Sequence, residues 1–429
     1  FVLRTAEDIF ATAGFEKIEI PLIEKSDLFI RSIGEETDTA GKEMYVFDTS
    51  QIGGKNRKKE RGDNDLIALR PEFTAGLARA YIENGMQVWP KPISLYTFGP
   101  CFRHDNPQAG RFRQFTQFDA EIYGEGDSTI DSHIIAALWY VFEKIKVPVE
   151  LNINSIGCRE CRVKIRKDLH EFFKRKESKL CEDCKKRLKK NPFRILDCKN
   201  DKCQAIIATA PITIDSICEL CRAHFMGVLE YLDDMEVPYN LVPTLVRGLD
   251  YYNRTVFEFA TKGDIKRQNA LAGGGRYDYL IEELGGEPTP AIGFAMGADR
   301  TVDYIRDNAI KISRPKAKIS AYVIHLGEEA KKLALKTVRD LRKLDISSSI
   351  AIGKDTMKAQ MKTADRINAR FSVIIGQREA VTGQAIIRDM RDGIQETVEF
   401  SELPEKVYQL VTERMREEEE YGKAKKLKK

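Results

Sequence analysis

The sequence lacks any apolar run that approaches the roughly 18 residues needed to span a bilayer. Among its 429 residues the longest apolar stretches, such as 205–211, are far shorter. It also lacks a basic segment followed by an apolar one near its start, which is the pattern of a secretory leader. We therefore expect a cytoplasmic protein with no membrane segment. Because Phe1 already lies within a segment of helical spacing, we also expect further residues to precede it.

Net charge is almost absent, since 70 Lys+Arg and 66 Asp+Glu leave only +4. This average conceals an uneven distribution. Residues 158–203 contain 17 Lys+Arg and 8 Asp+Glu, a local balance of +9, and the rest of the chain is slightly negative. A concentrated basic segment indicates contact with a polyanion at one place, and a solvated helical face is the alternative interpretation.

Cysteine is scarce outside one segment, because only Cys101 lies apart from the eight cysteines between positions 158 and 221. In a chain of this length without a leader, that grouping favours reduced thiols or a metal over a disulfide framework. The spacing fits structural zinc sites of four thiolates each. One site would use Cys181, Cys184, Cys198 and Cys203, and a second would use Cys158, Cys161, Cys218 and Cys221. The alternative is eight reduced thiols without metal.

Apolar periodicity and turn signals predict an α+β protein built from an interrupted body and two further parts. The body comprises residues 1–154 and 238–313, with a basic, mainly helical, Cys-rich insertion at 155–237. Strands and helices alternate in an α/β domain at 314–413, and a charged flexible tail is expected at 414–429. No internal repeats are present.

Two segments of the body, 95–103 and 112–124, are predicted to pair as antiparallel strands. Their alternation places Arg103, Gln117 and Glu121 on one surface, which is either an ordinary solvent-facing surface or a site for a small zwitterion and a phosphate. A run of three glycines at 273–275 is predicted to form a turn between strands at 255–259 and 291–294.

Four segments of the body carry a resemblance to a known family. Residues 102–115 (FRHDNPQAGRFRQF) resemble motif 2 of the class II aminoacyl-tRNA synthetases, and 293–300 (GFAMGADR) resemble motif 3. Residues 245–252 (LVRGLDYY) and 271–278 (LAGGGRYD) resemble the two signatures of histidyl-tRNA synthetases. Residues 15–24 resemble motif 1 more weakly. Long motifs in the correct order are far more specific than any one of them alone.

The resemblance implies a class II antiparallel-sheet catalytic body with a C-terminal anticodon-binding α/β domain. It also implies a histidine–tRNA ligase, acting as a homodimer on L-histidine, ATP with Mg²⁺, and tRNA(His). The insertion would lie over the tRNA acceptor arm, and zinc there would stabilise folding without taking part in catalysis. The alternatives are a synthetase-like regulatory protein and a tRNA-sensing module, neither of which ligates.

The same resemblance assigns roles to particular residues. Arg103 and Arg247 would be catalytic, contacting the α-phosphate from two sides. ATP would be bound by Arg103, Asp105, Arg111 and Arg300. Histidine would be bound by Glu72, Phe73, Thr74, Gln117, Glu121, Tyr251 and Tyr252, with Glu121 accepting an imidazole N–H. The sequence departs from the bacterial pattern at Asp105, Asn106 and Phe73, where Glu, Arg and Gly are usual.

Overall fold

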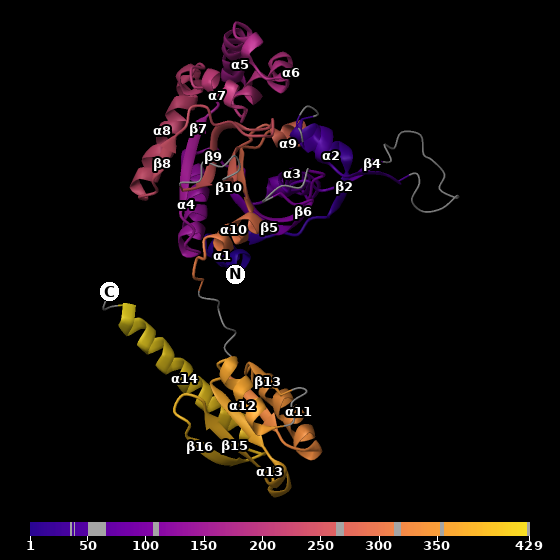
Figure 1. The fold of residues 1–429 in the computed structure, drawn as a ribbon, viewed down its shortest axis with the longest axis vertical. Coiled ribbons are helices and arrows are strands. Elements are labelled where there is room, and N and C mark those ends of the chain that lie inside the picture. The colour runs from indigo at the N-terminus through magenta and orange to yellow at the C-terminus, as the bar shows by residue number, and fades with distance from the viewer. Residues whose placement is uncertain are drawn as a thin grey trace. The chain divides into compact units, whose positions relative to one another are not determined.

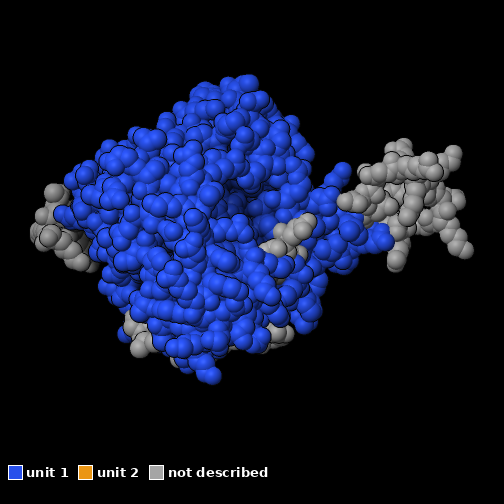
Figure 2. Space-filling model, turned by 90° about the horizontal axis from the view of Figure 1, so that it is seen from above, with its two compact units in different colours: residues 1–312 blue, residues 313–429 orange. Residues whose placement is uncertain are grey.

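The computed structural model describes residues 1–34, 37, 39–49, 66–105, 111–262, 270–312, 319–351 and 356–426. Residues 106–110 of motif 2 lie outside the described residues. The chain divides into two compact units, residues 1–312 and 313–429. In the space-filling view the first unit forms one continuous body whose surface is hollowed near its middle (Figure 2). None of the helices in the described ranges has the length and apolar character that a bilayer crossing requires.

The first unit is built on an eight-stranded sheet in the order β1-β5-β6-β11-β10-β9-β7-β8 (Figure 1). Its central pairs are antiparallel, whereas β1 lies parallel to β5 and β8 parallel to β7 at the two edges. The strands are β1 (Glu16–Lys17), β5 (Ile93–Phe102), β6 (Gln114–Tyr123), β7 (Val149–Ser155), β8 (Tyr239–Leu241), β9 (Asn253–Thr261), β10 (Ala270–Arg276) and β11 (Ala291–Gly297). The predicted α+β fold class is confirmed.

The predicted antiparallel pairing of β5 and β6 is confirmed, with Gly99 opposite Gln117 and Leu95 opposite Glu121. Alternation along β6 then decides which side chains enter which layer. Phe118, an apolar residue of β6, packs into the core beneath one face of the sheet. Its neighbour Asp119 belongs to the opposite face, with Gln117 and Glu121.

Helices cover both faces of this sheet. The apolar face packs against α1 (Val2–Thr12), α4 (Ser128–Lys144), α8 (Glu219–Asp234) and α10 (Ala298–Asp307). The opposite face meets α3 (Thr74–Glu83) and α9 (Leu280–Glu283), together with apolar side chains of the Cys-rich insertion. A smaller antiparallel sheet, β2 (Ile23–Lys25), β4 (Leu66–Leu69) and β3 (Val46–Asp48), lies beside α2 (Ser26–Ile33). The short helices η1 (Thr39–Glu43) and η3 (Met86–Val88) complete this part.

The triple glycine does not form a turn, so that prediction is wrong. All three residues lie within β10, between β9 and β11. A Cβ on Gly274 would lie 2.0 Å from the carbonyl oxygen of Gly293, and one on Gly273 would lie 2.4 Å from Nη1 of Arg247. The glycines are needed because neighbouring groups approach the strand too closely for any side chain.

The Cys-rich segment folds into short helices between β7 and β8. They are α5 (Arg159–Lys174), η4 (Glu177–Lys179), α6 (Glu182–Lys190), η5 (Pro192–Ile195), α7 (Asp201–Ile207) and η6 (Thr213–Ser216). The helix that follows, α8, starts at a cysteine pair but returns to the body. Its buried residues Phe225, Val228 and Leu232 share a core with α4.

The second unit is an α/β domain whose five-stranded sheet has the order β13-β12-β14-β15-β16. Its strands are β12 (Ala321–His325), β13 (Ser348–Ile350), β14 (Phe371–Ile375), β15 (Gln384–Asp389) and β16 (Gln395–Glu399), and its helices are α11 (Glu328–Lys343), α12 (Met357–Arg366), α13 (Gln377–Thr382) and α14 (Leu403–Lys426). Strand β12 pairs in parallel with both β13 and β14. Strand β15 pairs antiparallel with β14, and β16 pairs antiparallel with β15.

The predicted flexible tail is helical as far as Lys426. Ion pairs attach α14 to the domain as far as Glu418. Arg370 at the start of β14 lies 2.9 Å from Glu418, and Arg391 lies 3.2 Å from Glu417.

Candidate active site

A cavity of about 350 Å³ opens on the sheet face that carries Gln117. Five arginines from distant parts of the sequence line it: Arg103, Arg111, Arg194, Arg247 and Arg300. Carboxylates lie among them: Glu43, Glu72, Asp105, Asp197 and Asp299. A cavity of this size, rich in guanidinium groups, fits a ligand that bears several negative charges.

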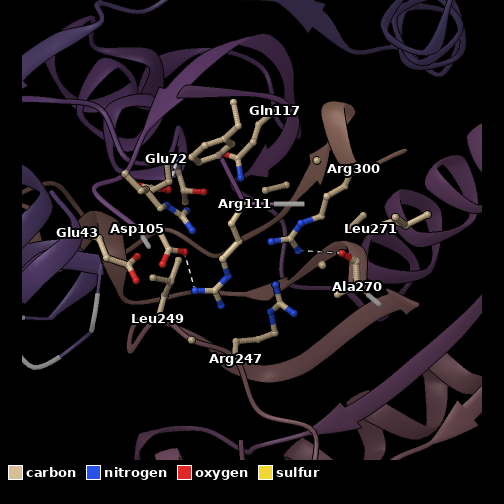
Figure 3. Close-up of a pocket in the computed structure, with 18 of the residues that line it drawn as sticks. Glu43, Glu72, Asp105, Arg111, Gln117, Arg247, Leu249, Ala270, Leu271 and Arg300 are labelled. Carbon is tan, nitrogen blue, oxygen red and sulfur yellow. Dashed lines mark hydrogen bonds and ion pairs between the residues drawn. The ribbon is translucent and has the colours of Figure 1, made fainter. Parts of the chain in front are cut away.

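The guanidinium groups of Arg111, Arg247 and Arg300 point toward one another across this cavity (Figure 3). Arg111 is oriented by Asp105 at 2.6 Å, and Arg300 donates to the carbonyl oxygen of Ala270 at 3.1 Å (Figure 3). Burial lowers the pKa of Arg300, and the positive charges of Arg111 and Arg103 lower it further. Like charges held this close indicate that an anion belongs between them.

Arg103 lies at the end of β5 and is fixed by the backbone. Its Nε donates to the carbonyl oxygen of Pro71 at 2.9 Å, and its guanidinium lies 5.2 Å from the centre of the Phe115 ring. These contacts hold one edge of the guanidinium, and the side chain lines the cavity.

Arg247 enters the cavity from the segment that follows β8. Its Nη1 donates to Glu258 at 3.1 Å, and the guanidinium lies directly over Gly273. Burial lowers the pKa of Arg247, but Tyr252 and the Glu258 carboxylate outweigh that effect and the net pKa is raised. Its buried Nε has no hydrogen-bond partner among the described residues. A buried N–H without a partner is costly, so this atom is a good candidate to bind a ligand.

Glu72 and Thr74 lie where α3 begins. The two carboxylate oxygens of Glu72 accept hydrogen bonds from the backbone N–H groups of Thr74 and Ala75, at 2.7 and 2.9 Å. Burial raises the pKa of Glu72. Gln117 accepts a bond from the Cys101 thiol at 3.4 Å. Glu72, Thr74 and Gln117 therefore present fixed polar groups to the cavity that they line.

Tyr251 and Tyr252 form an apolar wall of the cavity, with ring centroids 4.5 Å apart. Both rings are buried. Together with the polar groups at the start of α3, they line the cavity that the arginines also line.

Two predicted histidine-binding residues do not line the cavity in the described structure. Phe73 is fully buried in the core, with the Arg70 guanidinium 4.1 Å from its ring centre. Glu121 is also fully buried, and it accepts hydrogen bonds from Tyr277 at 2.5 Å and Thr74 at 2.8 Å. Burial raises the pKa of Glu121 to about 8, although these two hydrogen bonds oppose the shift.

Among the charged residues of the cavity, sequence reasoning missed Glu43 and Asp299 of the body. It also missed Arg194 and Asp197, which come from the Cys-rich insertion. Nothing in their local sequence distinguishes them from the other charged residues of this segment. Their place in the cavity depends on how the insertion folds back onto the body.

The eight clustered cysteines form the two groups that their spacing predicts. Cys158, Cys161, Cys218 and Cys221 make one group, and Cys181, Cys184, Cys198 and Cys203 make the other, with all sulfur atoms of a group within 4.8 Å of one another. The Cys158–Cys161 sulfurs are 3.5 Å apart and the Cys181–Cys198 sulfurs 3.8 Å apart. Thiolates about 2.3 Å from a tetrahedral zinc ion lie about 3.8 Å apart, so both donor sets fit zinc.

An antiparallel sheet with arginines of motifs 2 and 3 at a shared cavity defines the catalytic domain of a class II aminoacyl-tRNA synthetase. Within that class, the chain belongs to the histidyl-tRNA synthetase family. Residues 2–301 match the model of histidyl-tRNA synthetase, and residues 320–410 match that of an anticodon-binding domain.

Individual relatives agree with this assignment. The chain is 42% identical over 404 residues to a histidine–tRNA ligase of Desulforamulus reducens, covering 94% of this chain and 93% of the relative. Its fold is similar to that of the apo histidyl-tRNA synthetase of S. aureus, with a TM-score of 0.72 at 31% identity and coverage of 95% and 94%. An ATP phosphoribosyltransferase regulatory subunit/histidyl-tRNA synthetase from Bacillus halodurans C shares the fold alone, with a TM-score of 0.53 at 17% identity and coverage of 87% and 92%.

Proposed function

We propose that this protein is a histidine–tRNA ligase, which activates L-histidine with ATP and transfers it to tRNA(His). The observation that carries the proposal is the convergence of Arg111, Arg247 and Arg300 (Figure 3) in a cavity that Tyr251 and Tyr252 also line. The family assignment supports it, since relatives about 40% identical over nearly the whole chain are histidine–tRNA ligases.

In the first step, an oxygen of the histidine carboxylate attacks the α-phosphorus of ATP. A new oxygen–phosphorus bond forms, the bond to the bridging oxygen breaks, and pyrophosphate leaves. Because the nucleophile is already an anion, the protein supplies positioning and charge neutralisation rather than a general base. Arg103 and Arg247 would contact the α-phosphate, while Asp105, Arg111 and Arg300 would orient the nucleotide, which enters with Mg²⁺.

In the second step, a hydroxyl of the terminal ribose of tRNA attacks the histidyl carbonyl, and AMP leaves. Two parts of the chain support tRNA as the partner. One is the anticodon-binding domain at 320–410. The other is the excess of basic residues at 158–203, because phosphate contacts dominate affinity for nucleic acids.

Two further properties follow from the family resemblance, a homodimer and a cytoplasmic location. The small sheet next to motif 1 supports the dimer. The strand register places Ile23 and Phe47 on the same face of this sheet, and both of these large apolar side chains are exposed. Apolar side chains gathered on one exposed sheet are typical of a surface that another chain covers.

Histidine-dependent exchange of pyrophosphate into ATP tests the proposed function. We expect exchange with histidine and none with the other nineteen amino acids, since the fixed polar groups around the cavity reject ligands that leave them unpaired. A regulatory or tRNA-sensing protein would bind histidine or tRNA without exchange. Absence of exchange in folded, full-length protein would contradict the ligase proposal.

We also propose that each four-cysteine group holds one structural zinc ion. Soft thiolates select zinc among common divalent ions, and four protein ligands leave no open position for a substrate. The zinc would join helices of the insertion that are far apart in sequence, in addition to their packing around buried residues such as Leu169, Phe173 and Ile195.

Metal analysis tests the zinc proposal in protein purified without chelator. We expect two zinc ions per chain, and a loss of one in Cys184→Ser, whose sulfur belongs to one group. Cys101→Ser is the matched control, because Cys101 lies outside both groups, and we expect it to retain two ions. Metal-free protein with an intact thermal transition would refute the proposal.

A further inference from the structure

The segment that carries Arg247, Tyr251 and Tyr252 contacts more than the catalytic body. Three side chains of the Cys-rich insertion hold it by hydrogen bonds. Asn191 Nδ2 donates to Asp250 Oδ1 at 3.0 Å, and Arg194 Nη1 donates to the carbonyl oxygen of Gly248 at 2.7 Å. Both bonds join residues more than fifty positions apart in sequence.

The third contact comes from Arg162. Its Nη1 donates to the carbonyl oxygens of Asp250 and Tyr252, at 3.1 and 2.9 Å. Burial lowers the pKa of Arg162, and its guanidinium lies 5.5 Å from the ring centre of Phe193. The two parts of the insertion that reach the Arg247 segment therefore also contact each other.

Each of these residues lies next to a member of a four-cysteine group in the sequence, or between two of its members. Arg162 directly follows Cys161 at the start of α5. Asn191 and Arg194 lie in the stretch between Cys184 and Cys198, two members of the other group. Asn191 is fixed further, because its Oδ1 accepts the backbone N–H of Phe193 at 3.2 Å and so caps η5. Its amide can present only the NH₂ group to Asp250.

We propose that the insertion positions the segment 247–252 for histidine activation, with Arg162, Asn191 and Arg194 as positioning residues. The insertion then affects adenylate formation in the absence of tRNA, in addition to any contact with the acceptor arm. The reason is geometric. Gly248 follows Arg247 directly, and Asp250 lies two residues before Tyr252, so a shift of either backbone point moves the side chains that line the cavity.

Small displacements at such positions have large kinetic effects, because a misplacement of about 1 Å can cost about 100-fold in rate. The proposed effect is selective. The residues that the family resemblance assigns to ATP are Arg103, Asp105, Arg111 and Arg300, and none of them belongs to the segment 247–252. Pro71, Asp105 and Ala270 fix Arg103, Arg111 and Arg300 in turn. Loss of the contacts should therefore weaken the use of histidine more than the use of ATP.

The test is pyrophosphate exchange without tRNA, using the full chain and the double variant Asn191→Ala/Arg194→Ala. This inference rests on the proposed ligase function. We expect the KM for histidine to rise about tenfold or more and kcat to fall, while the KM for ATP changes less than about threefold. Lys189→Ala is the matched control, since it removes an exposed positive charge one helix turn away without touching the segment, and it should exchange like wild type.

Rescue distinguishes positioning from general folding. Arg194→Lys keeps a donor for the Gly248 carbonyl, so we expect it to recover most of the histidine dependence that Arg194→Ala loses. If the double variant does not fold, Asn191→Ser and Arg194→Ala are measured singly, with an expected rise in histidine KM of about threefold each. Wild-type-like histidine KM in folded variants overturns the inference and leaves the ligase function standing. Absence of exchange in the wild type overturns both.

Discussion

Replacement of Arg247 by alanine should lower the rate of histidine-dependent pyrophosphate exchange by about 1,000-fold, which is the upper range for removal of a donor that stabilises transition-state charge. Arg247 lines the cavity, and Tyr252 and Glu258 stabilise its positive charge by raising its pKa. Its Nε has no hydrogen-bond partner among the described residues. Its guanidinium lies directly over Gly273 of β10.

Binding of tRNA should be nearly unchanged in the same variant, since its affinity depends on phosphate contacts elsewhere. Arg247→Lys should show an intermediate rate, because lysine keeps the charge but cannot bind phosphate through two parallel N–H groups. Arg222→Ala, which removes an exposed arginine of α8, is the charge-matched control. Equal loss of exchange and of tRNA binding would refute the role assigned to Arg247.

Replacement of Glu121 by glutamine should reduce kcat/KM for histidine by about tenfold, the value of a hydrogen bond between neutral groups. The KM for ATP should change little. Glu121 lies in the interior behind Thr74. Thr74 lines the cavity, and its hydroxyl donates a hydrogen bond to the Glu121 carboxylate at 2.8 Å. Its space is fixed, since a Cβ on Gly293 would fall 1.3 Å from Glu121 Oε2. An unchanged kcat/KM for histidine would contradict a role of Glu121 in histidine binding through its bond to Thr74.

The same variant should be more stable than wild type at alkaline pH. Burial raises the pKa of Glu121 from its ordinary 4.5 to about 8, so the folded protein favours the protonated form. This contribution to stability is fully present below pH 4.5 and is lost as the pH rises through about 8. Glutamine has no such dependence. We expect the Tm of Glu121→Gln to exceed that of wild type by about 3 °C or more at pH 9, and the difference to shrink at pH 5. A constant difference across this range would contradict it.

Patterns within short segments of the sequence were enough to predict individual strands and the faces on which their side chains lie. The alternation along β6 assigned Phe118 and Gln117 to opposite faces, and the pairing of β5 with β6 followed from two adjacent strands and a turn. The glycines at 273–275 misled the prediction, because a glycine run is equally compatible with a turn and with a strand that neighbours approach closely. Only the position of Gly293 and Arg247 in space decides between them.

The residues of the candidate site also fall into those that the sequence predicted and those that only the structure shows. Residues within the motifs, such as Arg103 and Arg300, were predicted from sequence and line the cavity. Arg194 and Asp197 were not, since their role depends on contacts between an insertion and a segment fifty residues away. Glu121 was predicted, but its burial depends on Tyr277 and Thr74, which come from separate elements.

The two cysteine groups are nested along the chain, because the segment from Cys181 to Cys203 lies wholly between Cys161 and Cys218. The inner loop can therefore close before the outer loop, and no part of the chain has to pass through a closed loop. The shorter, inner loop has the smaller entropy cost of closure. Metal bound at the inner group, as proposed above, would leave the outer loop with fewer free residues to order. The insertion would then assemble from its tip toward its base, where its two ends lead into the neighbouring edge strands β7 and β8.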